Sequence, residues 1–341
     1  MLHGHGNDTI NIQKQINADF SSNIWYEPLN DGLVKHLTSC LNNISNYPPV
    51  AGSNLQAKVA DFYGVPANQI CITSGATEAF YLIAHAFNKS SSTIVVPSFA
   101  EYNDAALMFN HSIKSIKNSE LNTDTHFDTR LVWIGNPNNP DGVCIKKEAL
   151  KQMLEANPEV VFVVDEAYGE LCYGFESAVD LIATFNNLII VKSVTKLCSI
   201  PGLRLGYLMA SETLISKISA LRMPWSVATL ALEAGMYIYD NYSDFKINLP
   251  RIKEESVRFQ QHISVIKDIE VFPSNTNYFL SRLKNNTAAE LKQYLIEEHG
   301  FLIRDGFNFK SLDAHYFRLA VQGNKNNKDC ADAIAKFMNH D

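Results

Sequence analysis

One lysine, Lys196, stands among small and hydroxylic residues, after an apolar run at 188–191 that predicts a buried strand. Ser193 and Thr195 precede it, and Arg204 follows it by eight residues. An amine can form a Schiff base with an aldehyde, while hydroxyl groups and a guanidinium can bind a phosphate. The pattern therefore favours a lysine that binds an aldehyde beside a phosphate site. For this segment alone, a surface lysine in a loop before a helix is the alternative.

A second candidate phosphate site lies earlier in the chain. The segment 74–77, Ser-Gly-Ala-Thr, follows a predicted strand at 69–73 and opens a predicted helix that runs to residue 87. The N-terminus of a helix presents free backbone N–H groups and the positive end of its dipole, and both favour an anion. A plain helix cap is the alternative for this turn.

Polar residues also follow two other predicted strands. The apolar run 160–164 predicts a central buried strand, which ends at Asp165. A buried carboxylate needs a partner, because burying an unpaired charge costs several kcal/mol. A protonated pyridine nitrogen is one candidate partner, and an arginine or a helix cap is the alternative. The strand predicted at 130–135 ends in a dense turn cluster at 136–142, where α/β enzymes place ligand-binding groups.

Composition excludes several classes of protein. The 341 residues carry a net charge of -7, which argues against a nucleic-acid-binding surface. No apolar run approaches the roughly 18 residues that a membrane span needs. The beginning of the chain lacks the basic and apolar regions of a secretory signal, and the six cysteines form no CxxC pair. We therefore expect a cytoplasmic protein with reduced thiols, no membrane or nucleic-acid partner and no metal site.

Strands alternate with helices from residue 69 to residue 210, which predicts a mostly parallel sheet covered by helices on both faces. After residue 211 the pattern changes to long helical stretches and a few short strands, which indicates an α+β tail. We expect an α/β fold with a three-layer sheet and a smaller α+β domain. The expected parts are an N-terminal arm with part of the small domain at 1–45, a large domain at 46–245 and a small C-terminal domain at 246–341.

Taken in order, these motifs resemble the fold type I pyridoxal-phosphate enzymes, aminotransferase class I/II, over nearly the whole chain. The resemblance implies that Lys196 binds the aldehyde of pyridoxal 5'-phosphate and then moves protons, and that Asp165 keeps the pyridine nitrogen protonated. Tyr168 and Asn139 would hydrogen-bond the phenolic oxygen, and Tyr102 would stack on the ring. The residues implied to hold the phosphate are Gly75, Ala76, Thr77, Ser193, Thr195 and Arg204.

The resemblance also implies a homodimer with shared active sites. Tyr47, in a Tyr-Pro pair, is similar to a tyrosine that reaches the phosphate of the neighbouring subunit's cofactor. Arg318 is similar to the arginine that binds the substrate carboxylate. A non-enzymatic regulator with a pyridoxal-phosphate domain is a further alternative, but such proteins carry a DNA-binding helix-turn-helix domain, for which there is no room before Leu33.

Two subgroups of this family share the compact length, the threonine-phosphate decarboxylases and the histidinol-phosphate aminotransferases. Both ends of the chain resemble the first: His-Gly-His-Gly-Asn at 3–7, Asp-Phe-Ser-Ser-Asn-Ile at 19–24 and Ile-Arg-Asp at 303–305. This implies decarboxylation of L-threonine O-3-phosphate to (R)-1-amino-2-propanol O-2-phosphate in cobalamin biosynthesis. The alternative is transfer of an amino group from a histidinol-phosphate-type substrate to 2-oxoglutarate. Asp141 departs from the threonine that is usual in the family's loop.

The phosphorylated amino-acid substrate carries two anions, for which forked guanidinium donors are suited. We expect Arg304 and Arg318 to anchor these anions and so to set the orientation of the substrate. His3 and Asn23 are candidates to close the site over the substrate. For His3, a disordered terminal residue is the alternative.

Overall fold

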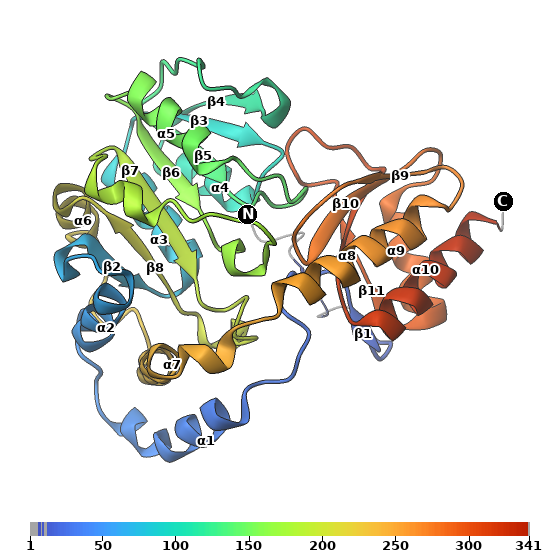
Figure 1. Ribbon diagram of the computed structural model, residues 1–341, viewed down its shortest axis with the longest axis horizontal. Helices are drawn as coiled ribbons and strands as arrows, with labels where there is room; N and C mark the ends of the chain where they lie inside the picture. Colours follow the sequence, from blue (N-terminus) through green and yellow to red (C-terminus); the bar gives the residue numbers. More distant parts are fainter. Residues whose placement is uncertain (1–5, 8, 10–11, 340–341) are drawn as a thin grey trace.

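The computed structural model describes residues 6–7, 9 and 12–339, which form a larger and a smaller unit side by side (Figure 1). The larger unit contains a seven-stranded sheet in the order β2-β8-β7-β6-β5-β3-β4. Only β8 runs antiparallel to its neighbours. The strands are β2 (Ile70–Thr73), β3 (Ser91–Val96), β4 (Ser112–Lys117), β5 (Leu131–Gly135), β6 (Val161–Asp165), β7 (Leu188–Ser193) and β8 (Gly206–Ala210).

The central strands are apolar at consecutive positions because both faces of the sheet are covered. Val132 and Ile134 of β5 pack into the core on one face, while Leu131 and Trp133 pack into the core on the other. The first face is covered by α2 (Ser53–Tyr63), α5 (Lys147–Ala156) and α7 (Thr229–Asp240). The second is covered by α3 (Gly75–Ala86), α4 (Ala100–Met108) and α6 (Glu212–Ser219). The predicted three-layer, mostly parallel α/β fold is confirmed.

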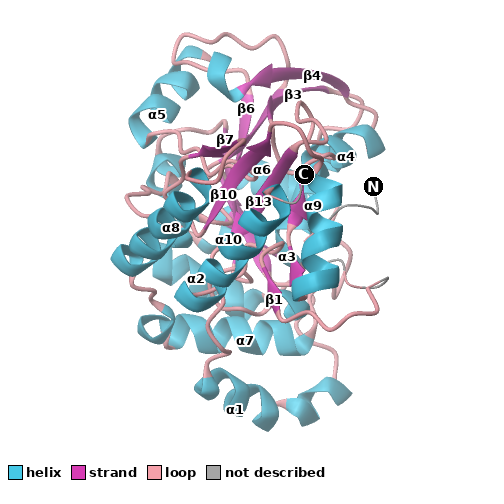
Figure 2. Ribbon diagram, turned by 90° about the vertical axis from the view of Figure 1, so that its right-hand side faces the viewer, coloured by secondary structure: helices cyan, strands magenta, loops and turns pink. Residues whose placement is uncertain are grey.

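The smaller unit has its own sheet, with the antiparallel order β12-β13-β10-β9. Buried phenylalanines in its core are Phe20, Phe259, Phe279, Phe301 and Phe317. Figure 2 shows its helices in front of the sheets. Its elements are α8 (Leu249–Ser264), β9 (Ile269–Phe272), β10 (Tyr278–Leu283), α9 (Ala288–Tyr294), β11 (Phe301–Leu302), β12 (Arg304–Asp305), β13 (Tyr316–Ala320) and α10 (Asn324–Met338).

The N-terminal segment contacts both units. Its strand β1 (Ala18–Asp19) pairs with β11 in parallel, so this part of the arm joins the smaller unit. Helix α1 (Asp31–Ser39) instead packs against α7 of the larger unit, below it in Figure 1. The expected domain boundaries stay a prediction. Among the helices that the structure describes, none has the length and apolar character that crossing a bilayer requires.

Candidate active site

A cavity of about 380 Å³ lies where the carboxyl ends of the parallel strands face the smaller unit. Ligands of open α/β sheets bind outside these strand ends. The cavity brings together predicted residues that are far apart in sequence. Those that line it are Asn23, Thr77, Asn139, Tyr168, Lys196, Arg204, Arg304 and Arg318. His3 lies outside the described residues.

One end of the cavity is suited to a phosphate. Gly75 begins α3 with a φ of +76°, and a Cβ atom there would lie 2.5 Å from Nη2 of Arg204. The backbone conformation therefore favours glycine, and the absence of a side chain lets the Arg204 guanidinium pack directly over this turn. The hydroxyls of Ser193 and Thr195 are 2.8 Å apart near the same strand end. A helix N-terminus, a guanidinium and paired hydroxyls together form an anion site.

Asp165 ends β6 with a buried carboxylate. Its Oδ2 accepts a 2.6 Å hydrogen bond from the Tyr102 hydroxyl, and its Oδ1 accepts a 2.9 Å bond from the Ala167 N–H. Burial raises the pKa of Asp165 to about 6, although these hydrogen bonds and the charge of Lys196 act to lower it. The group is thus mainly ionised at neutral pH at a desolvation cost, which a cationic partner in the cavity would relieve.

The predicted stacking residue, Tyr102, lies behind the cavity wall. Its ring is 2% exposed and stacks on Trp133, with centroids 6.0 Å apart and planes at 20°. Phe99, whose ring centroid is 5.9 Å from that of Tyr102, lines the cavity, as do the rings of Tyr168 and Phe309. In this structure Tyr102 holds Asp165, and its stacking on a bound ring stays a prediction. Sequence reasoning missed Phe99, which stands three residues before Tyr102.

The amine of Lys196 lies over the ring of Tyr168, with Nζ 5.7 Å from the ring centroid. The N-terminal arm holds the lysine loop, because the Trp25 N–H donates to the Lys196 carbonyl at 3.1 Å. The Ser199 hydroxyl donates in turn to the Trp25 carbonyl at 2.7 Å. Tyr168 is fixed by Tyr278, with ring centroids 5.0 Å apart. Residues remote in sequence therefore position the predicted catalytic amine.

Two buried arginines form the opposite wall. Arg304 of β12 and Arg318 of β13 are direct cross-strand partners in the antiparallel register. Like charges directly opposite one another destabilise a sheet unless an anion lies between them. Arg318 donates from Nη1 to the Asn139 amide oxygen and from Nη2 to the Ser21 carbonyl. Burial lowers the pKa of Arg318 below its ordinary value, although arginine remains protonated in proteins.

Asn23 carries the clearest sign of an absent ligand. The residue is 1% exposed and lines the cavity, yet neither polar atom of its side chain has a hydrogen-bond partner within the described residues. The Nε atom of Arg318 is also buried without a partner there. Buried polar groups are normally hydrogen-bonded, so these atoms indicate a polar ligand. Ser21 and Asn7 line the cavity beside Asn23 and were not predicted.

The loop that carries Asn139 is held closed by Asp141, the residue that departs from the family pattern. Asp141 accepts hydrogen bonds at Oδ1 from the Asn138 side chain at 2.8 Å and from the Val143 N–H at 3.1 Å. An aspartate that bonds to nearby backbone stabilises a turn. Asp141 therefore supports the loop rather than disturbing it, and Asn139 still lines the cavity.

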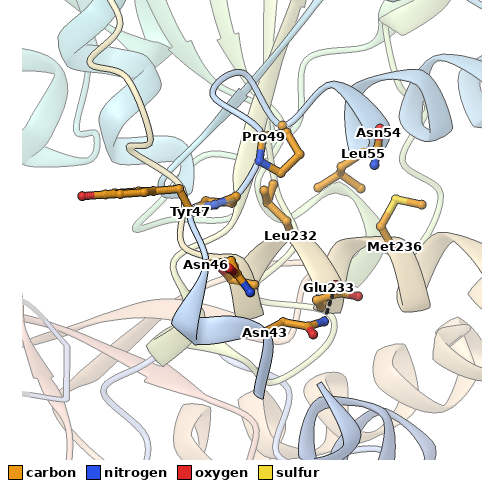
Figure 3. A pocket seen from close by; sticks show the side chains of 12 residues that line it. Asn43, Asn46, Tyr47, Pro49, Asn54, Leu55, Leu232, Glu233 and Met236 are labelled. Carbon is orange, nitrogen blue, oxygen red and sulfur yellow. Dashed lines mark hydrogen bonds between the residues drawn. The ribbon is translucent and has the colours of Figure 1, made fainter. Parts of the chain in front are cut away.

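Tyr47 does not line the cavity of its own chain. Its side chain is 84% exposed and lies against Trp225, with ring centroids 5.0 Å apart. In Figure 3 its hydroxyl points away from the other labelled residues of the pocket. An exposed aromatic pair of this kind is typical of an interaction surface, but its contact with a second subunit stays a prediction.

Comparison with known proteins gives the class. A family model for aminotransferase class I and II matches residues 34–337, and the chain belongs to this family. It is a fold type I pyridoxal-phosphate-dependent enzyme.

Among solved structures, the chain is similar to L-threonine-O-3-phosphate decarboxylase from Porphyromonas gingivalis, with a TM-score of 0.91, 36% identity and coverage of 94% of this chain and 98% of that one. It is also similar to the histidinol-phosphate aminotransferase from Clostridium acetobutylicum, with a TM-score of 0.85, 28% identity and coverage of 94% and 99%. The threonine-phosphate decarboxylase of Salmonella typhimurium is 27% identical over 332 residues, which cover 94% of this chain and 91% of that protein.

Proposed function

We propose that this protein decarboxylates L-threonine O-3-phosphate to (R)-1-amino-2-propanol O-2-phosphate, a step of cobalamin biosynthesis, with pyridoxal 5'-phosphate as cofactor. The observation that carries the proposal is the buried pair Arg304 and Arg318, which face one another across two strands at the lysine-containing cavity. A small substrate with a carboxylate and a phosphate supplies two anions for two guanidinium groups. Similarity to two threonine-phosphate decarboxylases supports the same substrate.

The residues of the cavity fit pyridoxal 5'-phosphate. Gly75 and Arg204 form a cradle at a helix N-terminus that suits its phosphate, and the buried Asp165, whose pKa is raised by burial, suits a pyridinium as an additional cationic partner. Lys196 lies on the cavity wall with an amine that suits its aldehyde. When bound, this cofactor accepts the electron pair released as a bond to the substrate Cα breaks.

The protein's own residues choose which bond breaks. Arg304 and Arg318 hold both anions of the substrate and thereby select either the bond to the carboxylate or the bond to hydrogen. Lys196 then acts on protons: it returns one to Cα after carbon dioxide leaves. In an amino-transfer reaction it would instead remove the proton from Cα. Asp165 keeps a proton on the ring nitrogen through its buried carboxylate.

The second candidate is an aminotransferase that acts on histidinol phosphate and 2-oxoglutarate. It is favoured by the similarity to histidinol-phosphate aminotransferases, which reaches 28% identity over 94% of the chain. Its substrates also carry anions that the two arginines could bind. Histidinol phosphate, however, carries a phosphate and no carboxylate, so it supplies one anion to the two arginines where L-threonine O-3-phosphate supplies two.

A paired assay on the cofactor-loaded protein distinguishes them. One reaction contains L-threonine O-phosphate, and carbon dioxide release is followed. The other contains L-histidinol phosphate and 2-oxoglutarate, and glutamate is followed. We expect carbon dioxide without any requirement for an oxo acid. Glutamate without carbon dioxide would contradict the decarboxylase proposal and support the aminotransferase.

We further propose a homodimer in which Tyr47 of each subunit reaches the cofactor phosphate of the other. The exposed apolar side chains around Tyr47 support a second copy as the partner: Ile44 is 64%, Met223 is 74% and Trp225 is 47% exposed. Exposed apolar side chains of this kind favour association. We also propose that the protein is cytoplasmic.

Mixed dimers test the shared site. We expect sedimentation to show a dimer and Tyr47→Phe to weaken cofactor binding about fivefold, the value of one hydrogen bond of about 1 kcal/mol. Combining Lys196→Ala chains with Tyr47→Phe chains should restore one site per mixed dimer in which both residues are intact. A fully active monomer would contradict this proposal.

A further inference from the structure

A cluster of three metal-ligating side chains lies outside the active site, between α1 and α7. His36 and Cys40 are four residues apart at the end of α1, so they lie on one face of the helix. Glu233 of α7 faces them. We propose that His36, Cys40 and Glu233 form a binding site for Zn²⁺.

The distances between the ligand atoms support this assignment. His36 Nε2 is 3.4 Å from Glu233 Oε2 and 3.7 Å from Cys40 Sγ. All three ligand atoms lie within 4.8 Å of one another. In a tetrahedral zinc site, with bonds of about 2.1 Å to nitrogen or oxygen and about 2.3 Å to sulfur, neighbouring ligand atoms lie about 3.4 to 3.6 Å apart. An ion can therefore enter with only small side-chain movements.

The chemistry of the three ligands selects the metal. Magnesium and calcium prefer oxygen ligands, whereas a thiolate, an imidazole and a carboxylate together suit zinc. The side chains of His36 and Glu233 are 29% and 30% exposed, so the ion has a path from solvent. On binding, Cys40 releases its proton to water and its sulfur donates an electron pair to the ion, with no change of oxidation state.

Neighbouring groups hold the ligands in place. The Asn43 side chain donates a 3.3 Å hydrogen bond to Glu233 Oε1, which leaves Oε2 directed at His36. This bond is drawn in Figure 3, where Asn43 and Glu233 line a cavity of about 210 Å³. The Ser39 hydroxyl lies 3.9 Å from Cys40 Sγ. Such supporting contacts orient metal ligands, and with three protein ligands the fourth position of a tetrahedral ion would be taken by water.

The site would tie the N-terminal arm to the larger unit. Helix α1 connects the segment that carries Asn23 in the active-site cavity with the segment that carries Tyr47 at the surface. A bound ion joins this helix to α7, which packs on the central sheet. Zinc would therefore bind the folded protein in preference to the unfolded chain and stabilise the packing of the arm, because a site assembled from two helices does not exist in the unfolded chain.

Metal analysis of the full-length protein tests the proposal. The protein is stripped with a chelator, dialysed against Zn²⁺ and assayed for metal per chain, and its melting temperature is measured with and without Zn²⁺. We expect about one ion per chain and a raised melting temperature. His36→Ala, Cys40→Ser and Glu233→Gln should each weaken Zn²⁺ binding at least about tenfold, since even supporting residues contribute 10- to 100-fold.

Matched variants exclude adventitious binding. Cys144→Ser removes a thiol that lies 3.4 Å from Cys172, and His126→Ala removes an exposed imidazole; both should leave Zn²⁺ binding unchanged. Co²⁺ in place of Zn²⁺ should give a thiolate charge-transfer band that Cys40→Ser abolishes. The proposal would be overturned if the parent protein bound no Zn²⁺ or if all three ligand variants bound Zn²⁺ as tightly as the parent protein. Loss of Zn²⁺ binding only in Cys144→Ser would also overturn it. Circular dichroism shows whether each variant is folded.

Discussion

The two walls of the active-site cavity differ in how completely their polar groups are satisfied. On the wall of the larger unit, the Asp165 carboxylate accepts two hydrogen bonds. Directly beside it, Glu166 is fully buried and accepts from Ser177 and from the Ala178 N–H. Behind the site, Nζ of Lys192 lies 2.9 Å from a carboxylate oxygen of Glu166 and 2.9 Å from one of Glu170, so it forms an ion pair with each.

The wall formed by the arm and the smaller unit is incomplete. The amide of Asn23 and the Nε of Arg318 are buried without hydrogen-bond partners among the described residues. Arg318 also faces Arg304 across the strand pair. An unsatisfied buried polar group costs about 1–3 kcal/mol, so this wall lowers the stability of the ligand-free protein. We propose from this difference that the larger unit's wall binds the cofactor and that the substrate completes the second wall.

Removing the amine of the larger unit's wall should have the largest effect. Lys196→Ala should lower activity by more than about 1000-fold, because a positioned proton-transfer group contributes up to about 10⁴-fold and the cofactor also loses its attachment point. Steady-state kinetics and the visible absorbance of lysine-bound cofactor measure this. Lys325→Ala, at an 88% exposed side chain, is the control and should change neither. Retained absorbance in Lys196→Ala would mean that another amine binds the cofactor.

Substitution of Asp165 should have opposite effects on activity and on stability. Asp165→Asn should lower activity by about 10²–10³-fold, the range for loss of one electrostatic contact to the reacting group. In the cofactor-free protein the same change should be stabilising. The pKa of Asp165 is raised from 3.8 to about 6, so its contribution to stability is present below about pH 4 and is lost as the pH rises to about 6.

The size of this loss follows from the pKa shift, and is about 3 kcal/mol above pH 6. Denaturant unfolding of both cofactor-free proteins at several pH values measures it. The difference in free energy of unfolding should grow from pH 4 to pH 6 and then remain constant. A variant that is less stable than the parent protein at pH 8 would contradict the desolvation argument.

The arginines test the second wall. Arg318→Met should raise KM for the phosphorylated substrate by roughly 10- to 150-fold, because a hydrogen bond to a charged group contributes about 1.5–3 kcal/mol. Affinity for the cofactor should change little. Arg258→Met removes a surface arginine of the same unit, paired with Glu254, and serves as the control. A loss of cofactor binding that exceeds the loss of substrate binding would assign Arg318 to the other wall.

Substitution of Asn23 should have the smallest effect on substrate affinity, and it contrasts with substitution of Asn157, which should affect stability instead. Asn23→Ala should leave the free energy of unfolding of the ligand-free protein unchanged within about 1 kcal/mol, while substrate affinity falls about fivefold. Asn157 is an equally buried asparagine whose amide bonds to Thr125, Met153 and Phe127. Asn157→Ala should therefore lose about 1–3 kcal/mol of stability without affecting affinity. Isothermal titration and denaturant unfolding distinguish the two, and equal destabilisation would show that Asn23 is already satisfied.

Much of the larger unit's wall could be predicted because each chemical group directly follows a buried strand. Lys196 follows β7, Asp165 ends β6 and Thr77 lies in the first turn of the helix after β2. An apolar run marks such a strand, and parallel strands bring their carboxyl ends to one edge. Where sequence reasoning failed, the pattern was weaker. The edge strand β4 was not predicted from the sequence, because most of its side chains are exposed. Phe99 differs in no local feature from a residue of an ordinary helix start.

The second wall was predicted only in part. Arg304 and Arg318 were identified from a resemblance, but their direct opposition is set by strand register. The bond between Arg318 and the Ser21 carbonyl joins residues 297 positions apart, and no periodicity indicates it. The cluster of His36, Cys40 and Glu233 likewise combines a helical spacing that is visible in the sequence with a residue of a distant helix.

The sequence by itself determined the alternation of strands and helices and the polar residues placed at strand ends, because local hydrophobic periodicity and turn chemistry act over a few residues. Those features were sufficient for the fold class and marked candidate residues of one wall, while the roles of these residues came from the resemblance to a family. The tertiary structure decided which buried groups remain without partners, which arginines face one another and how the arm holds the Lys196 loop. These properties depend on contacts between segments far apart in the chain, and such contacts exist only when the larger unit, the smaller unit and the arm pack together.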